Sequence, residues 1–183
     1  VERTEPPMQR SSNGLYTDLI DAIVSQQLSV KAAAAIMERF TALFPDRQPN
    51  PHRVLAMEEE RFREAGLSRP KIGYLRGIAT AIVDGEVDLG VIAGYDDEAF
   101  IEAITALKGV GRWTAEMLLI FSLGRRDVFS VGDLGLRNAV ARLYDVDRDD
   151  REAIATIAAA WSPYRSLACH YLWKSLDNEP AVG

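Results

Sequence analysis

The sequence predicts an all-α protein, and three observations carry that prediction. Apolar residues recur every three or four positions along most of the chain, as they do on the buried face of a helix. Helix-capping residues such as Ser29 and Asp96 stand immediately before several of these stretches. No stretch alternates apolar and polar residues over a useful strand length, and residues 86–91 are the best strand candidate.

The first two helices are indicated by an apolar stripe and a cap. The stripe of the first helix consists of Leu15, Leu19, Ile20, Ile23 and Val24. Ser29 is expected to cap a second helix over residues 30–44, because its hydroxyl can accept from a backbone N–H of the first turn. Pro45 ends that helix, since proline has no N–H and cannot continue the hydrogen-bond ladder.

Glycine and proline residues divide the next stretch of the chain. Short helices are expected over residues 52–56 and 58–65, and Gly66 is placed to end the second of them. A longer helix follows, with Pro70 in its first turn and Gly85 just beyond its end. Proline is favoured near a helix start and glycine past a helix end, so both boundaries are well marked.

The second half of the chain continues the helical pattern. Asp96 or Asp97 can cap a helix that leads into a Gly-x-Gly sequence. Its apolar positions are Phe100, Ile101, Ile104 and Leu107. Further helices are expected over residues 113–123, 134–144, 149–160 and 163–176.

Length and composition limit the classes of protein to consider. A chain of 183 residues can form one well-buried domain or two small lobes that share a core. No apolar run approaches the roughly 20 residues of a membrane span, and the N-terminus lacks the pattern of a signal peptide. Cys169 is the only cysteine, expected to be a small buried apolar residue. His52 and His170 show no metal-ligand spacing, and a cytoplasmic location is expected.

The charge distribution is uneven. The net charge of −6 is unfavourable for binding nucleic acid, because cationic side chains supply most non-specific affinity for phosphates. Residues 101–142, however, hold six basic and four acidic residues, which gives this segment +2 and the remainder −8. A local basic face on an acidic body suits an enzyme that visits DNA transiently, although charge alone does not indicate DNA.

The Gly-x-Gly sequence is a candidate phosphate-binding hairpin. Gly109 and Gly111 lie between an apolar helix end and a Trp-Thr-Ala sequence that starts the next helix. Glycines permit positive φ and close approach of the backbone, and N–H groups at a helix N-terminus can bind an anion. The alternative is a tight turn between two helices that binds nothing.

Asp133 is the candidate catalytic residue. It stands between Gly132 and Gly135, where a loop becomes a helix, so one interpretation is an ordinary N-cap. The other is the role that the family resemblance of this motif implies, in which the carboxylate stabilises positive charge on a sugar as the glycosidic bond breaks. The two interpretations are compatible, because a cap holds a carboxylate rigidly at the edge of a loop.

Together the hairpin and Asp133 resemble the helix-hairpin-helix DNA glycosylases with a Gly/Pro-rich loop and a catalytic Asp, and among them the 3-methyladenine DNA glycosylase II (AlkA-type) enzymes. The resemblance runs from about Leu15 to Leu176 and is strongest over residues 107–136 and 161–173. It implies two helical lobes flanking a DNA-binding and active-site cleft, without the N-terminal β-rich domain of some relatives. The expected lobes are residues 15–125, which include the hairpin 107–115, and residues 126–183 with the N-terminal arm 1–14.

The resemblance also implies roles for individual residues. Trp113 occupies the position at which bifunctional relatives carry a nucleophilic Lys, so lyase chemistry is not expected. Trp173, Trp113 and Met117 are expected to line the base pocket, where cation–π attraction can hold an alkylated base; for Trp173 a core position is the alternative. Met117 replaces an aromatic found in some relatives.

The remaining implied roles concern contact with DNA. The residues expected to bind its backbone are Lys108, Gly109, Val110, Gly111, Arg112 and Thr114. A base that leaves the duplex leaves a gap, and Gln27, in a Gln-Gln-x-Ser sequence, is the candidate wedge; an exposed helical glutamine is the alternative. Lys71 is a candidate contact to the DNA backbone. Arg165 could bind phosphate or pair with an acidic residue, and Trp161 and Tyr164 are expected to be structural.

The expected function is therefore a monofunctional glycosylase that excises alkylated bases from double-stranded DNA and leaves an abasic site. A glycosylase for deaminated or other damaged bases is the alternative within the class, and a non-catalytic DNA-binding module is the alternative outside it. No cofactor is expected for catalysis. The resemblance implies a Na⁺ or K⁺ ion at the carbonyls of Leu107 and Gly109, and a monomer without membrane contact is expected.

Overall fold

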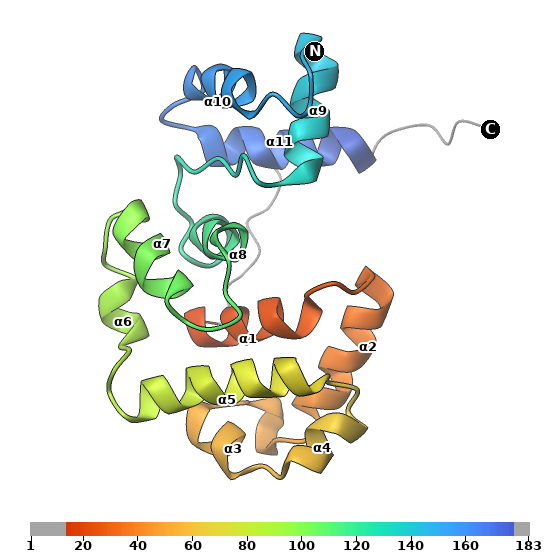
Figure 1. Cartoon of the computed structure of the whole chain (residues 1–183), viewed down its shortest axis with the longest axis vertical. Helices are drawn as coiled ribbons and strands as arrows, with labels where there is room; N and C mark the ends of the chain where they lie inside the picture. Colours follow the sequence, from red (N-terminus) through yellow and green to blue (C-terminus); the bar gives the residue numbers. More distant parts are fainter. Residues whose placement is uncertain (1–13, 178–183) are drawn as a thin grey trace, which may run out of the picture. The chain divides into compact units, whose positions relative to one another are not determined.

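The computed structural model describes residues 14–177, which form two compact units, 14–118 and 119–177. We call them the N-terminal unit and the C-terminal unit and describe each by itself. The predicted arm 1–14 lies, except for Gly14, outside the described residues. Every regular element in the described range is helical, so the all-α prediction is confirmed there (Figure 1). None of these helices combines the length and apolarity needed to cross a bilayer.

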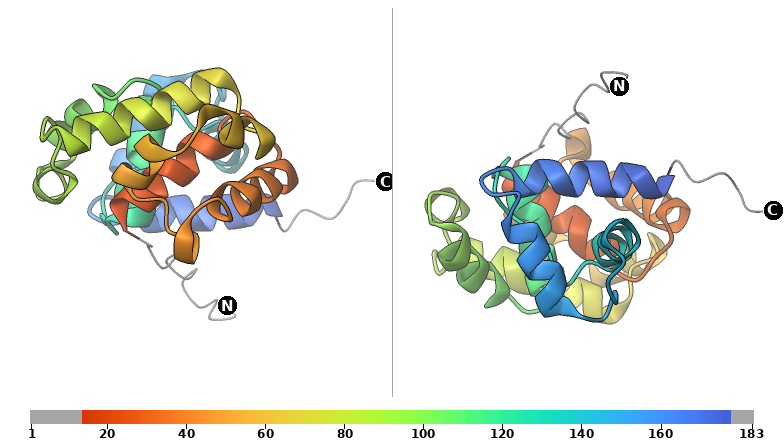
Figure 2. Two further views of the ribbon diagram at one scale, coloured as in Figure 1. Left: turned by 90° about the horizontal axis from the view of Figure 1, so that it is seen from below. Right: turned by 90° about the horizontal axis from the view of Figure 1, so that it is seen from above.

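The N-terminal unit contains eight helices and one short 3₁₀ turn within the described residues. Their bounds are α1 Leu15–Ser25, α2 Val30–Thr41, the 3₁₀ turn Pro45–Arg47, α3 Pro51–Ala56, α4 Glu59–Glu64, α5 Arg69–Val83, α6 Leu89–Ile92, α7 Asp97–Thr105 and α8 Arg112–Met117. Helix α5 is central, because α1, α3 and α4 all pack against it (Figures 1 and 2). Helices α7 and α8 pack against each other across the hairpin.

Apolar side chains from these helices form the core of the N-terminal unit. Leu19, Ile23 and Val24 of α1 are completely buried, as the predicted stripe requires. The rings of Phe40 and Phe62 lie 5.9 Å apart in a stacked arrangement, which holds α2 against α4. Burial of a phenylalanine contributes roughly 1.5–3 kcal/mol relative to its exposure, so each ring of this pair stabilises the unit by an amount of that order.

The C-terminal unit is built on α9 Leu134–Tyr144, α10 Arg151–Ala159 and α11 Arg165–Asp177. Helix α9 packs on α11, and α10 packs on α9 (Figure 2). Cys169 lies in this core with no exposed surface, and burial raises the pKa of its thiol to about 12. The prediction that Cys169 is a small buried residue is confirmed.

Two predicted helices and the strand candidate differ from the structure in more than one or two terminal residues. The helix expected over 30–44 ends at Thr41, before the proline turn. The helix expected over 113–123 is confirmed in extent, but only its first half is α-helical: α8 ends at Met117 and the chain continues directly as a π-helical turn, Leu118–Ser122. The stretch 86–91 is not a strand, because Asp88 caps the short helix α6 by accepting from the N–H groups of Gly90 and Val91.

Candidate active site

Asp133 occupies the N-cap of α9, as its sequence position predicts. Its Oδ1 accepts the backbone N–H of Leu136 at 2.8 Å and the indole Nε1–H of Trp173 at 3.1 Å. Two donors from different helices therefore fix the direction of one carboxylate oxygen. The structure thus brings together Asp133 and Trp173, which are 40 positions apart in the sequence.

Gly135 explains the second glycine of the Gly-Asp-Leu-Gly sequence. A Cβ at this position would lie 3.2 Å from the Asp133 Oδ1 and 3.5 Å from the Trp173 ring. These distances leave little room for a larger side chain beside the hydrogen bond between the carboxylate and the indole. Gly135 therefore permits their close approach.

The Trp173 indole belongs to an aromatic cluster. Phe121, from the π-helical turn, stacks on it with ring centroids 5.5 Å apart, and His170 meets it edge-on at 5.8 Å. Burial lowers the pKa of His170 from its ordinary value, which favours the neutral imidazole. Trp173 is thus held by aromatic packing as well as by Asp133.

The loop before Asp133 is anchored to the start of α11. Asp127 binds the Arg165 guanidinium through both carboxylate oxygens, at 2.8 and 3.1 Å, and accepts the Ser162 hydroxyl at 2.8 Å. The Arg165 side chain holds the pKa of Asp127 at about 2. Of the two roles considered for Arg165, the structure shows the ion pair with an acidic residue.

The hairpin between α7 and α8 has a precise backbone geometry. Gly109 has φ of +93°, and a Cβ there would overlap the ring of Tyr74 on α5, so only glycine fits without rearrangement. Gly111 is different, because its φ of −97° suits any residue and a Cβ there would meet no atom within 4 Å. The fold thus requires Gly109 but leaves the space beside Gly111 open.

The hairpin carbonyls can be tested as ligands for the implied Na⁺ or K⁺ ion. The carbonyl oxygen of Leu107 accepts the N–H of Val110 at 3.1 Å, and that of Gly109 accepts the side-chain amide of Gln26 at 2.9 Å. A carbonyl oxygen has two lone pairs, so each of these bonds leaves one lone pair on its oxygen. Neutral carbonyl oxygens are hard donors that suit an alkali cation, and the two residues therefore fit the ion.

Among the residues expected to bind the DNA backbone, Lys108 and Arg112 are exposed, whereas Val110 and Thr114 are buried. A contact from Thr114 would thus have to use its backbone. The Arg112 guanidinium is committed within the N-terminal unit, where it binds both carboxylate oxygens of Glu98 and, through Nε, that of Glu116 at 3.0 Å.

Trp113 and Met117 also belong to the N-terminal unit. The Trp113 side chain follows the hairpin directly and is 48% exposed. Met117 is half-buried at the last position of α8. Their roles in a base pocket stay predictions, whereas Trp161, which packs edge-on against Phe129, has a structural contact, as expected.

Gln27 lies outside any helix, because α1 ends at Ser25. It is exposed and adopts φ of +57°, in the left-handed region that a residue with a Cβ rarely occupies. The sequence alternative of an exposed glutamine within a helix is therefore wrong. The preceding Gln26 has a different task, since its amide binds the hairpin carbonyl of Gly109.

Sequence reasoning missed three residues that shape the site: Phe121, Tyr74 and Gln26. The apolar run around Phe121 gives no sign that one residue stacks on a tryptophan far along the chain. Tyr74 reaches the hairpin from α5 and Gln26 reaches it from the turn after α1, and no local pattern marks such contacts. The sequence gives Gln26 no role of its own beyond its place next to Gln27, the candidate wedge.

Known proteins resemble this chain over most of its length. The family model described as "HhH-GPD superfamily base excision DNA repair protein" matches residues 20–163. DNA-3-methyladenine glycosylase 1 of Schizosaccharomyces pombe is 39% identical over 163 residues, which cover 87% of this chain and 72% of that protein.

Two solved structures are also similar. DNA-3-methyladenine glycosidase from Bacillus halodurans has a TM-score of 0.86 and 38% identity, covering 94% of this chain and 80% of that one. The 3-methyladenine DNA glycosylase Mag1 of S. pombe, in complex with abasic DNA, has a TM-score of 0.85 and 36% identity, covering 95% and 87% of the two chains.

Proposed function

Because the chain belongs to the HhH-GPD superfamily of base excision DNA repair proteins, we propose that it is a monofunctional DNA glycosylase. It removes alkylated bases of the 3-methyladenine type from double-stranded DNA by hydrolysing the N-glycosidic bond, which leaves an abasic site. The similar proteins that are named as 3-methyladenine glycosylases support alkylated bases as the substrate class. The observation that carries the mechanism is the Asp133 carboxylate, held by the Leu136 N–H and the Trp173 indole.

Asp133 stabilises the transition state by charge. As the bond to the base breaks, the deoxyribose acquires oxocarbenium character, and a fixed carboxylate lowers the energy of that cation. Its orientation is set before the reaction by two hydrogen bonds, so little reorganisation is needed when the charge develops. Asp133 also orients the attacking water. A base that is already cationic departs without prior protonation, and no second carboxylate is required.

Trp113 makes the reaction a simple hydrolysis. An indole cannot attack the sugar and cannot form an imine, so the strand is not cleaved by a lyase step. Its half-exposed ring can instead stack on a cationic base, for which cation–π attraction contributes up to about 2 kcal/mol where the pair is desolvated. Met117, which belongs to the same unit as Trp113, is proposed as a further residue that contacts the base.

The hairpin holds the DNA backbone. The open space beside Gly111 lets a phosphate approach the backbone N–H groups that start α8, and exposed Lys108 adds positive charge. A Na⁺ or K⁺ ion at the carbonyls of Leu107 and Gly109 would add a positive charge beside that phosphate. Gln27 fills the gap left by the extruded base. This activity is proposed for the cytoplasm, on nucleoid DNA.

The direct test uses duplex DNA that carries alkylated purines. The purified protein is incubated with this DNA, and abasic sites are then cleaved with mild alkali. We expect cleavage at alkylated purines that depends on the protein and is absent from undamaged DNA of the same sequence. Release of deaminated bases without release of alkylated ones would assign another substrate, and no release of any base would leave a DNA-binding module.

A further inference from the structure

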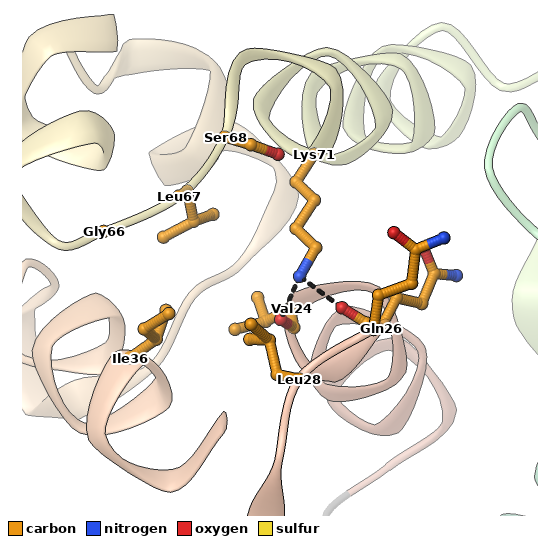
Figure 3. Close-up of a pocket in the computed structure, with 9 residues that line it drawn as sticks. Val24, Gln26, Leu28, Ile36, Gly66, Leu67, Ser68 and Lys71 are labelled. Atoms are coloured by element: carbon orange, nitrogen blue, oxygen red, sulfur yellow. Dashed lines mark hydrogen bonds between the residues drawn. The ribbon is translucent and has the colours of Figure 1, made fainter. Parts of the chain in front are cut away.

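Lys71 binds the end of a neighbouring helix instead of pointing freely toward solvent. Its Nζ donates to the carbonyl oxygens of Val24 at 2.8 Å and Gln26 at 2.7 Å (Figure 3). The lysine lies in the first turns of α5, 47 and 45 positions from these two acceptors. The sequence offered Lys71 as a contact to DNA, but its amine is committed to these two carbonyls.

The C-terminus of α1 needs such a partner. The last carbonyls of a helix have no intrahelical donor, and the helix dipole places partial negative charge there. The last turn of α1 contains no basic residue of its own. Lys71 therefore supplies, from another helix, the donor and the positive charge that α1 lacks.

The carbonyls that Lys71 binds flank the wedge candidate. Gln27 directly follows Gln26, is exposed and has φ of +57°. A non-glycine residue in the left-handed region is strained, and it keeps that conformation only where its surroundings fix it. On the other side of Gln27, the N–H of Leu28 donates to the Ser25 carbonyl at 3.3 Å, and Ser29 caps α2.

The same turn is tied to the DNA-binding hairpin. The side-chain amide of Gln26 donates to the Gly109 carbonyl at 2.9 Å, while the backbone carbonyl of Gln26 accepts from Lys71. One residue thus links α5, the end of α1 and the hairpin. The pocket beside Lys71 has a volume of about 210 Å³, whereas ligand pockets usually measure roughly 300 Å³ or more. We therefore interpret it as a gap between packed helices and not as a small-molecule site.

We propose that Lys71 is a positioning residue for the wedge: by binding the Val24 and Gln26 carbonyls, it fixes the strained turn that presents Gln27 to the damaged duplex. This inference rests on the proposed glycosylase function. Lys71 touches neither base nor sugar and acts through Gln27. Displacement of a substrate-contacting group by about 1 Å can reduce a rate by about 10²-fold, so loss of Lys71 should slow excision without abolishing the chemistry of Asp133.

The test is a double-mutant cycle with two readouts. Lys71→Met keeps the length of the side chain and removes its donor, Gln27→Ala removes the wedge, and Arg61→Met removes one charge from an exposed position of α4 as a control. The first readout is single-turnover excision from alkylated duplex at saturating protein. The second is the fluorescence of 2-aminopurine placed beside a stable abasic-site analogue, which reports insertion of the wedge without any reaction.

We expect Lys71→Met to slow excision about ten- to a hundredfold and to reduce the fluorescence change, while Lys71→Arg restores part of both and Arg61→Met changes neither. In the Gln27→Ala background, Lys71→Met should have less than about a twofold further effect, because coupled residues are not additive. If Lys71→Met unfolds at the assay temperature, Lys71→Gln replaces it in the same cycle.

Two results would overturn the proposal. One is an unchanged rate and fluorescence change in Lys71→Met, and the other is an effect of equal size with and without Gln27. Failure of the glycosylase function is distinguishable, because it would appear as absence of excision by the unmodified protein. In that case the fluorescence of the abasic duplex still reports whether Lys71 controls the turn.

Discussion

Replacement of Asp133 by Asn separates the two tasks of this side chain. The amide oxygen of an asparagine can accept the same two hydrogen bonds, from the Leu136 N–H and the Trp173 indole. The cap and the contact to Trp173 are therefore retained in Asp133→Asn. What disappears is the negative charge, which the proposed mechanism requires and the fold does not.

The structure sets the expected size of each effect. A carboxylate at a helix N-terminus contributes about 0.3–1 kcal/mol through the helix dipole. For a chain of this size, that loss lowers the melting temperature by about 1–4 °C. Loss of an electrostatic contact to the transition state, in contrast, reduces the rate by about 10²-fold or more. The two tasks thus differ in energy by enough to be measured separately.

The assay compares Asp133→Asn with a matched cap. Asp150 caps α10 by accepting the Ala153 N–H at 2.9 Å, so Asp150→Asn makes the same chemical change at an exposed helix start of the same unit. Melting temperature, affinity for undamaged duplex and single-turnover excision are measured for both variants. We expect similar small losses of stability in both, unchanged DNA affinity, and slow excision in Asp133→Asn alone.

Two outcomes would refute this reasoning. Near-normal excision by a folded, DNA-binding Asp133→Asn protein would mean that Asp133 is only a cap. Equal slowing by Asp150→Asn would show that excision responds to general helix stability and not to a carboxylate beside the sugar. Asp133→Ala adds a check, because it also removes the cap and should cost about 1 kcal/mol more stability.

Three further predictions concern the hairpin and its neighbours. Borohydride added during the reaction on damaged DNA should trap no covalent adduct, because Trp113 supplies no amine; a strong adduct band would contradict the monofunctional mechanism. Gly111→Val should keep the melting temperature of the unmodified protein, yet bind damaged and undamaged duplexes more weakly to the same extent, because the contact is to phosphate. Gly109→Ala should instead lower the melting temperature, because its Cβ would overlap the ring of Tyr74. Glu98→Gln should release the Arg112 guanidinium toward phosphate, which tightens DNA binding and steepens the plot of log affinity against log salt by about 0.9; an unchanged slope would show that Arg112 does not reach the DNA.

The features that could be predicted from sequence are those with local causes. Ser29, Asp96 and Asp133 each cap a helix by accepting the backbone N–H three residues ahead, and such a residue before an apolar helical stretch is recognisable in the sequence. The buried stripe of α1 is equally local, because it depends only on helical periodicity. The fold class and the position of the candidate carboxylate follow from signals of this kind.

The features that could not be predicted depend on contacts between distant segments. The apolar run 118–122 fits an α-helix as well as a π-helical turn, so sequence could not show the irregular turn that places Phe121 on Trp173. Nothing near Lys71 indicates that its partners are carbonyls 45 or more positions away. Arg165 left two alternatives open for the same reason, since its partner Asp127 is 38 positions distant.

These distant contacts bear on how an acidic protein binds DNA. The +2 charge of residues 101–142 overstates what a phosphate would meet, because two of its arginines pair with acidic residues outside the segment. Arg112 is paired with Glu98, and Arg137, only 11% exposed, is paired with Asp149. In the proposed mode of binding the backbone of the hairpin contacts the DNA, and its N–H dipoles neutralise fewer phosphates than lysine and arginine do. Since the salt dependence of affinity scales with the number of phosphates neutralised, binding should be modest and only weakly dependent on salt. Such binding would allow rapid dissociation from intact DNA. Selection of damaged over undamaged DNA would then depend on contacts to the base and the sugar and not on contacts to the phosphate backbone.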